Sequence, residues 1–428
     1  MFPITRGATR QVVSLSYGGA AVTKGAVDTV VNDPLAQEIA AQTLAQFLPP
    51  HIGDSILEIA NIVYQEFSGE LMFVDVNIAL SVIAIMQGLS KKPVYDTRKF
   101  SRVEDSPIAK RFAHYMKYAD AAYGTINPLK TDEEFIADYT GIPRYKVQPY
   151  VNKNAVRGKA MLEHFMAVDD REKSVIVALK GTGTLEAALK DVRFLYTEID
   201  LWGQSFQVHG GMWEAAQGLV QFPLLISQVT EALVANPEYG LVVLGHSLGG
   251  GVAGLVAPLL AEPGPDGSFL TNGKTVPGRK IECYGLEPAA SLDEQLRQKT
   301  KTMTYSLVNK NDIVPALSYG VLQDFKAFAL YLKHNTLYLG SIIDGLSMNR
   351  VDPDTYMAKF RSIATHKKLV PPGRVWVIDT TDNGTLEIAE CLNANQRFGE
   401  ARFILGMVQD HILFNCFTSM DALKHLFE

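Results

Sequence analysis

The sequence contains little cysteine and no long apolar run. Its 428 residues include only three cysteines, and these form no Cys-x-x-Cys pair: Cys283, Cys391 and Cys416. This usage argues against a disulfide framework and against a structural zinc site, and it suits a reducing compartment. The longest apolar run, residues 76–86, is too short to cross a bilayer. We therefore expect no transmembrane segment.

The sequence also lacks an excess of positive charge and a clear export signal. Its 40 Lys and Arg residues are outnumbered by 46 Asp and Glu residues, which gives a net charge of −6. A nucleic-acid partner is not expected, because such proteins neutralise phosphates with a basic face. Residues 1–19 lack the continuous apolar core of a signal peptide. We expect a cytoplasmic protein that meets a membrane, if at all, from the side.

The pattern of apolar residues changes along the chain. Residues 1–104 are predicted to be a mainly helical N-terminal region, because their apolar positions recur at helical spacing. From about residue 160, short β-rich runs alternate with helical stretches; the clearest of these runs are residues 174–184, 241–247, 280–288 and 303–312. Such alternation predicts an α/β fold with a mostly parallel sheet and helices on both faces. This second part is predicted to span residues 105–428.

One stretch at the end of a predicted strand indicates chemistry. In LVVLGHSLGG, residues 241–250, Ser247 stands between two glycines, and a helix of small residues follows. A strand, a tight turn with a central serine and a helix together are typical of a nucleophile elbow. The alternative is a glycine-rich turn that contains a serine by chance. His246, inside this turn, is expected to support its geometry.

A nucleophilic serine needs a base, and the base needs an acid that orients it. In α/β hydrolases the acid follows the serine in the chain, and the histidine follows the acid. Asp312 comes directly after a predicted strand, at the carboxyl edge of the sheet, and His411 lies near the C-terminus at the start of a predicted helix. Asp312 and His411 are therefore the candidate acid and base, although a lone histidine is often structural.

A second turn supplies candidate oxyanion donors. The run VIVALKGTGT ends a predicted strand at Leu179, and it brings Thr182 to the same sheet edge as Leu248. The two backbone N–H groups and the Thr182 hydroxyl are suited to a developing oxyanion. The alternative is an ordinary strand-ending turn. The following residues Leu185, Ala188 and Leu189 form an apolar helical stripe, which is either a lid that meets lipid or a core-facing surface.

These motifs, in this order, resemble the class 3 lipases, which are fungal-lipase-like α/β hydrolases. The segments that carry the resemblance are VALKGTGTLEAALKD, VHGGMWEAA, GHSLGG, NKNDIVPALS and MVQDHILF. Within that family, HYMKYADAAYG and PPGRVWVI make the chain most similar to the sn-1-specific diacylglycerol lipases. The resemblance covers about residue 105 to the C-terminus and is weaker over an insertion at about residues 319–368.

The resemblance implies roles for individual residues. It assigns Ser247, Asp312 and His411 to the triad, Thr182 and Leu248 to the oxyanion hole, and Asp191 to support of the oxyanion hydroxyl. The chain departs from the diacylglycerol lipases in three respects. It lacks their N-terminal transmembrane helices, it lacks their long regulatory insertion between the acid-side strands, and it carries the aromatic-rich insertion. That insertion is a cap over the acyl pocket, a membrane-docking face, or an ordinary helical excursion packed on the core.

Together these features predict a serine hydrolase that cleaves acyl-ester bonds of di- or triacylglycerol through an acyl-enzyme. No metal or organic cofactor is implied. The expected partner is a lipid ester at a membrane or lipid-droplet surface. Two alternatives stay open: a phospholipase or thioesterase with the same triad, and a lipid-binding scaffold without turnover.

Overall fold

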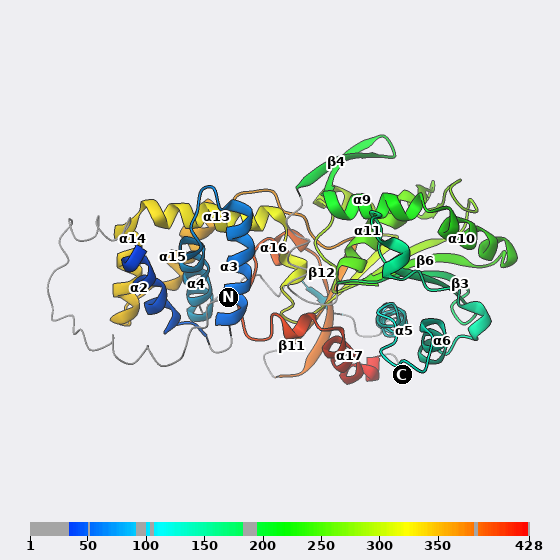
Figure 1. Cartoon of the computed structure of the whole chain (residues 1–428), viewed down its shortest axis with the longest axis horizontal. Coiled ribbons are helices and arrows are strands. Elements are labelled where there is room, and N and C mark those ends of the chain that lie inside the picture. Colours follow the sequence, from blue (N-terminus) through cyan, green and yellow to red (C-terminus); the bar gives the residue numbers. More distant parts are fainter. Residues whose placement is uncertain are drawn as a thin grey trace.

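In the computed structural model, the chain has a β-sheet part covered by helices and a helical bundle at the other end of the molecule (Figure 1). The structure describes residues 34–49, 52–90, 100–102, 107–182, 195–380 and 384–426. Helix α13 (Tyr319–His334) leaves the sheet part and enters the bundle, so one helix belongs to both ends.

The main sheet has eight strands in the order β1-β12-β11-β10-β9-β6-β3-β2. The central strands β3, β6, β9, β10 and β11 are parallel, whereas β2, β12 and β1 pair antiparallel at the two ends. The bounds of the strands are β1 Phe100–Arg102, β2 His164–Asp169, β3 Ser174–Leu179, β6 Gly240–His246, β9 Ile281–Leu286, β10 Thr304–Asn309, β11 Arg374–Thr380 and β12 Leu386–Cys391. The prediction of a mostly parallel sheet is confirmed.

The apolar run of β6 explains why the sheet is covered on both faces. Leu241 and Val243 pack in one hydrophobic core, with residues of α9, α10 and α11. Val242 and Leu244 pack in another, with residues of α5, α6 and α17. Successive side chains of a strand point to opposite faces, so a continuous apolar run requires helices on both.

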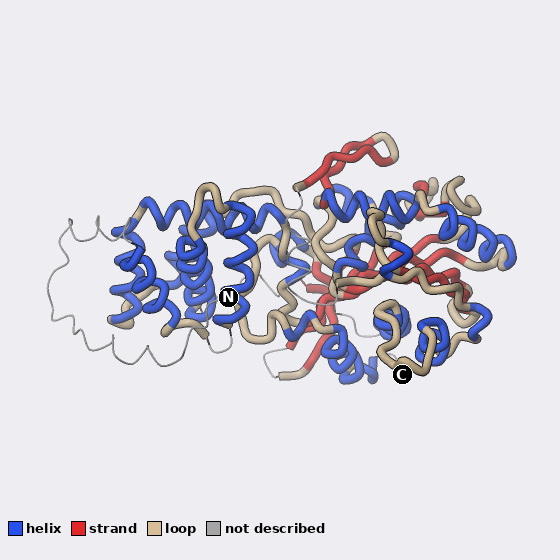
Figure 2. The backbone as a smooth tube through the Cα atoms, viewed as in Figure 1, coloured by secondary structure: helices blue, strands red, loops and turns tan. Residues whose placement is uncertain are grey.

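The helices on the two faces lie above and below the sheet in Figure 1. Their bounds are α9 Gly210–Val220, α10 Pro223–Ala235 and α11 Leu248–Leu259 on one face, and α5 Pro107–Ala121, α6 Asp132–Thr140 and α17 Leu413–Ala422 on the other. Figure 2 shows a small hairpin that projects beyond the helices; it is formed by β4 (Tyr196–Leu201) and β5 (Gln204–His209). The remaining short elements are η2 Arg144–Lys146, α7 Lys153–Val156, β7 Ala261–Pro263, β8 Phe269–Thr271, α12 Glu294–Lys299, η3 Val314–Ala316, α16 Ala394–Phe398, η4 Gln409–His411 and η5 Lys424–Leu426.

The helical bundle combines two segments that are far apart in the sequence. Its helices are α2 Pro34–Ala45, α3 Gly53–Phe67 and α4 Phe73–Leu89, together with α13, α14 Thr336–Ser347 and α15 Pro353–Ile363. Helix α4 is apolar and mostly buried, because α2, α3, α13 and α15 all pack on it. The aromatic-rich insertion therefore shares a core with the N-terminal helices, which the sequence did not indicate.

A buried carboxylate ties these two segments together. Asp75 of α4 accepts hydrogen bonds from the backbone N–H of Met72 at 2.9 Å and from Gln37 Nε2 at 3.3 Å. Lys333 Nζ of α13 lies 3.0 Å from the same carboxylate. A charge buried to this extent needs such partners, so Asp75 fixes how α13 lies on α4.

Across the described ranges, no single helix combines the length and the apolar character needed to cross a membrane. Only α9 and α10 taken together meet those criteria, and they are bent by 61° where they meet.

Candidate active site

Ser247 stands on the sharp turn between β6 and α11. Its backbone has φ 57° and ψ −126°, a conformation that non-glycine residues seldom adopt and that costs about 1–3 kcal/mol. The turn is tight, because a β-carbon at Gly249 would lie 2.4 Å from the backbone oxygen of Leu179. A strand, a strained serine and a helix are the parts of a nucleophile elbow, which presents the serine oxygen at the end of the sheet.

The structure brings Ser247 together with the two side chains expected to accompany it. Ser247 Oγ lies 2.9 Å from His411 Nε2, and His411 Nδ1 lies 2.9 Å from Asp312 Oδ2. The other carboxyl oxygen of Asp312 accepts a hydrogen bond from the backbone N–H of Val314 at 2.9 Å. Because a carboxylate only accepts, Nδ1 carries the imidazole proton and Nε2 accepts the serine proton. All three side chains are buried.

The loops that carry the acid and the histidine are bonded to each other. Asn309, the last residue of β10, donates from Nδ2 to the backbone oxygen of Asp410 at 3.1 Å. The backbone N–H of Ile313 donates to the backbone oxygen of Met407, also at 3.1 Å. These bonds fix the separation of the two loops, so the acid and the base keep their distance without help from a ligand.

Thr182 lies beside the elbow. The preceding Gly181 packs so closely that a β-carbon there would lie 2.5 Å from the backbone oxygen of His246 and 3.2 Å from Ser247 Cβ. Thr182 Oγ1 is buried and has no hydrogen-bond partner among the described residues. Leu248 is the first residue of α11, and the first N–H groups of a helix have no partner within it. The site thus offers hydrogen-bond donors next to the serine.

His246 is buried behind the serine and has a partner on each ring nitrogen. Tyr123 Oη lies 2.6 Å from Nδ1, and Glu287 Oε2 lies 3.0 Å from Nε2. The backbone oxygen of His411 is also 3.1 Å from Nε2. Burial, with His411 beside it, lowers the pKa of His246 to about 3, so the ring is neutral at physiological pH.

Sequence reasoning did not identify Tyr123 or Glu287 as part of this site. Glu287 directly follows β9, at the same sheet edge as Ser247 and Asp312, and that position was the available signal. Burial and the charge of Asp312 raise the pKa of Glu287 well above its ordinary value. Tyr123 follows α5 in a different layer, and nothing in its local sequence points to the serine.

Four of the expected residues cannot be placed. The supporting Asp191 and the proposed lid stripe, Leu185, Ala188 and Leu189, lie outside the described residues.

The side chains of His246, Glu287 and His411 also have the composition of a metal site, because their ligand atoms all lie within 4.8 Å of one another. The ring nitrogens of His411 already bond Ser247 and Asp312, however, and those of His246 bond Tyr123 and Glu287. An ion would have to displace these partners. We therefore assign the group to hydrogen bonding.

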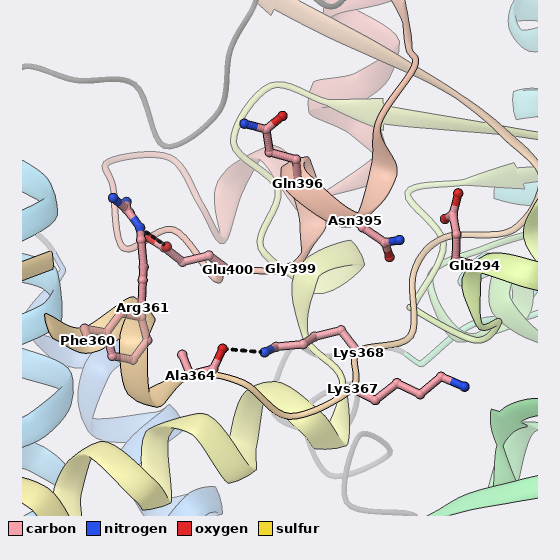
Figure 3. Close-up of a pocket in the computed structure, with 10 residues that line it drawn as sticks. All are labelled: Glu294, Phe360, Arg361, Ala364, Lys367, Lys368, Asn395, Gln396, Gly399 and Glu400. Atoms are coloured by element: carbon pink, nitrogen blue, oxygen red, sulfur yellow. Dashed lines mark hydrogen bonds and ion pairs between the residues drawn. The ribbon is translucent and has the colours of Figure 1, made fainter. Parts of the chain in front are cut away.

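A cleft of about 610 Å³ opens between the end of α15 in the bundle and α12 and α16 in the sheet part, and its lining includes none of the residues of the serine site (Figure 3). It is lined by Glu294, Phe360, Arg361, Ala364, Lys367, Lys368, Asn395, Gln396, Gly399 and Glu400. Its cations Arg361, Lys367 and Lys368 each pair with a carboxylate. Because these charges are already satisfied, the cleft presents no unpaired cation to a ligand.

Comparison with known proteins matches the part of the chain that contains Ser247 and Asp312 to lipases. Residues 176–321 match the family model described as lipase, class 3. The segment is 29% identical over 168 residues to diacylglycerol lipase-beta of Mus musculus, covering 39% of this chain and 23% of that protein. It is 28% identical over 153 residues to the secreted mono- and diacylglycerol lipase A of Penicillium camembertii, covering 36% of this chain and 46% of that protein. The chain thus spans less than half of these curated relatives.

Solved structures of fungal lipases have distantly similar shapes. A lipase from Rhizopus microsporus var. chinensis superposes with a TM-score of 0.46 at 17% identity, covering 76% of this chain and 92% of that one. The Rhizomucor miehei lipase propeptide complex gives 0.42 at 14% identity, covering 75% and 84%. The resemblance to class 3 lipases is confirmed by the sequence match, which covers residues 176–321.

Proposed function

We propose that this chain is a serine hydrolase that cleaves acyl-ester bonds of glycerolipids, with Ser247 as nucleophile, His411 as general base and acid, and Asp312 as the orienting acid. The observation that carries the proposal is the unbroken row of hydrogen bonds from Ser247 Oγ through both nitrogens of His411 to Asp312. A serine hydroxyl is unreactive at neutral pH unless a positioned base removes its proton, and this arrangement supplies that base.

The first half of the reaction forms the acyl-enzyme. His411 Nε2 takes the proton of Ser247 as Oγ attacks the ester carbonyl, and the carbonyl oxygen becomes an oxyanion. The backbone N–H groups of Thr182 and Leu248, with the Thr182 hydroxyl, donate to that oxyanion. The imidazolium, held by Asp312, then gives its proton to the departing glycerol oxygen as the carbon–oxygen bond breaks.

The second half repeats these steps with water. His411 removes a proton from the water, which attacks the acyl carbon. The carbon–Ser247 bond breaks, the serine oxygen recovers its proton from His411, and the fatty acid leaves. The chain's own side chains carry every proton transfer in this sequence, so the mechanism implies no metal or organic cofactor.

The substrate class is inferred from the relatives. They are named diacylglycerol lipases and mono- and diacylglycerol lipases, which supports an acylglycerol substrate, and we propose di- or triacylglycerol for this chain. Such substrates reside in membranes and lipid droplets, and the enzyme would meet them at those surfaces.

A fluorophosphonate probe tests the chemistry without knowledge of the acyl chain. Attack by an activated serine displaces fluoride and leaves the probe on Oγ. We expect the wild-type protein to be labelled at Ser247, and the Ser247→Ala variant to stay unlabelled while its thermal unfolding is unchanged. A lipid-binding scaffold would not be labelled. Hydrolysis of mono-, di- and triacylglycerol and of phospholipid then separates the lipase from a phospholipase.

A further inference from the structure

A row of buried and half-buried polar side chains next to Ser247 has no part in the steps above. It runs from Tyr123 Oη to the His246 ring and on to the carboxyl of Glu287. Glu287 is fully buried at 0% exposure, and its φ of 49° is one that non-glycine residues rarely adopt. A buried carboxyl and a strained backbone each destabilise the fold, so a compensating contact at this position is expected.

The hydrogen bonds fix where the His246 proton lies. The backbone oxygen of His411 can only accept, and it lies 3.1 Å from His246 Nε2, so Nε2 carries the proton. Nδ1 is then the acceptor, and Tyr123 donates to it from Oη at 2.6 Å. Glu287 Oε2 shares the Nε2 proton at 3.0 Å. The single N–H of His246 is therefore directed at the backbone of His411 and at Glu287.

These contacts close a ring around the reacting atoms. Ser247 is bonded through its side chain to His411 Nε2 at 2.9 Å, and through its backbone to the neighbouring His246. The His246 side chain returns to the backbone oxygen of His411, and the two imidazoles lie 5.0 Å apart with 30° between their planes. Ser247 and His411 are thus linked twice: directly by the Oγ–Nε2 hydrogen bond, and indirectly through the side chain of His246, which precedes Ser247 in the chain.

Resting on the proposed function, we propose that His246 is a positioning residue for His411, and that Glu287 keeps His246 in place as an uncharged hydrogen-bonding carboxyl. Among the described residues, Glu287 lies at ion-pair distance only from His246, which is itself neutral. The Cys416 thiol is a second buried neighbour of this carboxyl. Neither neighbour balances a negative charge, so the neutral acid is the stable form in this site.

The titratable groups that face Glu287 reinforce this assignment. Burial and the charge of Asp312 raise the pKa of Glu287 well above the ordinary value. The groups around it are Tyr123, His246, His411, Asp312, Asp410 and Cys416. The two aspartates oppose a further negative charge, and the thiol and the neutral histidine do not offset it.

The test compares Glu287→Ala with Glu287→Gln. Alanine removes the acceptor for His246, so His411 loses a support; we expect kcat on a short soluble ester to fall about 10- to 100-fold with little change in KM. Glutamine keeps the shape and the acceptor of a neutral carboxyl, and we expect it to restore most of the turnover lost in Glu287→Ala. Glu282→Ala is the matched control, because Glu282 is another buried acidic residue, within β9 itself, but it pairs with Arg111 and Lys280 and not with His246. It should lower Tm and leave kcat unchanged.

A pH profile gives a readout that a purely structural role would not move. If Glu287 is neutral, the Glu287→Gln enzyme should show the wild-type pH dependence of kcat/KM. If Glu287 is charged, removing that charge would shift the acidic limb of the kcat/KM profile to lower pH, because a negative charge that favours protonation of the nearby base would be gone. His246→Gln, which can still donate to the His411 oxygen, should retain more turnover than His246→Phe, which cannot.

Three results would overturn the proposal: wild-type kcat in Glu287→Ala, a Glu287→Gln enzyme as impaired as Glu287→Ala, or a shifted pH profile in Glu287→Gln. If Glu287→Ala does not fold, Glu287→Gln decides alone, since retained turnover with an unshifted profile supports the proposal and loss of either contradicts it. A wild-type protein with no esterase activity and no fluorophosphonate labelling would instead contradict the proposed function, whatever the variants do.

Discussion

At the scale of single residues, Thr182 gives the sharpest test of the oxyanion site. Thr182→Val keeps the backbone N–H and the side-chain shape but removes the buried hydroxyl, which has no partner in the part of the chain that the structure describes. Loss of one oxyanion donor reduces turnover about 10²- to 10³-fold. We expect this fall in kcat with nearly unchanged KM, because the hydroxyl would act on the developing charge and not on the bound ester. Unchanged kcat would leave only the Thr182 backbone in the mechanism.

Removal of the acid or the base tests the other half of the site. His411→Ala should reduce ester hydrolysis by roughly 10⁴-fold or more, and Asp312→Asn should be severe but less complete. The measurement is initial rate on a soluble ester, with circular dichroism to show that each variant is folded. A His411→Ala enzyme with near-normal turnover would show that another histidine is the base.

The sequence allowed the acid and base candidates to be named because strand ends of a parallel sheet meet at one edge. Asp312 follows β10 there, and chain order left His411 as the best-placed histidine. Glu287 occupies the same kind of position after β9, yet its role depends on contacts with His246 and Tyr123 that no local pattern reveals. From the sequence alone, Glu287 followed by Pro288 is typical of an exposed turn, and only the structure shows that Glu287 is buried.

At the scale of elements, the stripe of Leu185, Ala188 and Leu189 stays a prediction, because it lies outside the described residues. If it is a lid, opening exposes apolar area, which costs about 25 cal/mol per Å² in water and much less at a lipid surface. Activity on emulsified esters should then exceed activity on the same esters below their aggregation limit. Leu185→Ser with Leu189→Ser should weaken that preference and spare soluble-ester hydrolysis. Joint loss of soluble-ester activity and Tm would show that the stripe is core.

The helices show what periodicity can and cannot predict. Helical spacing predicted the N-terminal helices, and an aromatic-rich composition marked the insertion. Neither signal identified the surfaces on which these helices pack. The partner of Asp75 on α4 is Lys333 on α13, 258 residues away in the chain. The apolar face of a helix indicates that this face is buried, but it does not indicate which other helix covers it.

At the scale of the whole molecule, Gln87 joins the helical bundle to the segment that leads to His411. Its Nε2 donates to the backbone oxygen of Ala401 at 3.0 Å, and its Oε1 accepts from the backbone N–H of Phe403 at 2.8 Å. We also propose a division of the chain into residues 1–104 and 105–428, with the 319–368 insertion joined to the first part by packing. Through the two Gln87 bonds, the bundle helps to hold the segment that leads to His411, here called the histidine loop.

Gln87→Ala should therefore affect both stability and catalysis. It leaves buried backbone groups of Ala401 and Phe403 without partners, at about 1–3 kcal/mol for each unsatisfied group. We expect a lower Tm and a lower kcat on a soluble ester. Lys326→Ala is the control, because it removes an ion pair with Glu70 and a contact with the Phe67 ring, both within the bundle and away from the histidine loop, and it should change neither by much. A Gln87→Ala protein with reduced Tm and wild-type kcat would show that the bundle does not act on the histidine loop.

The most direct test of the central claim is the release of fatty acid from dispersed diacylglycerol by the purified 428-residue chain, compared with the Ser247→Ala variant of equal Tm. We predict steady release by the wild type and a rate reduced by about 10⁴-fold or more in the variant, because Ser247 forms the acyl-enzyme. Equal rates for the two proteins, or no release by a folded wild type across mono-, di- and triacylglycerol, would contradict it.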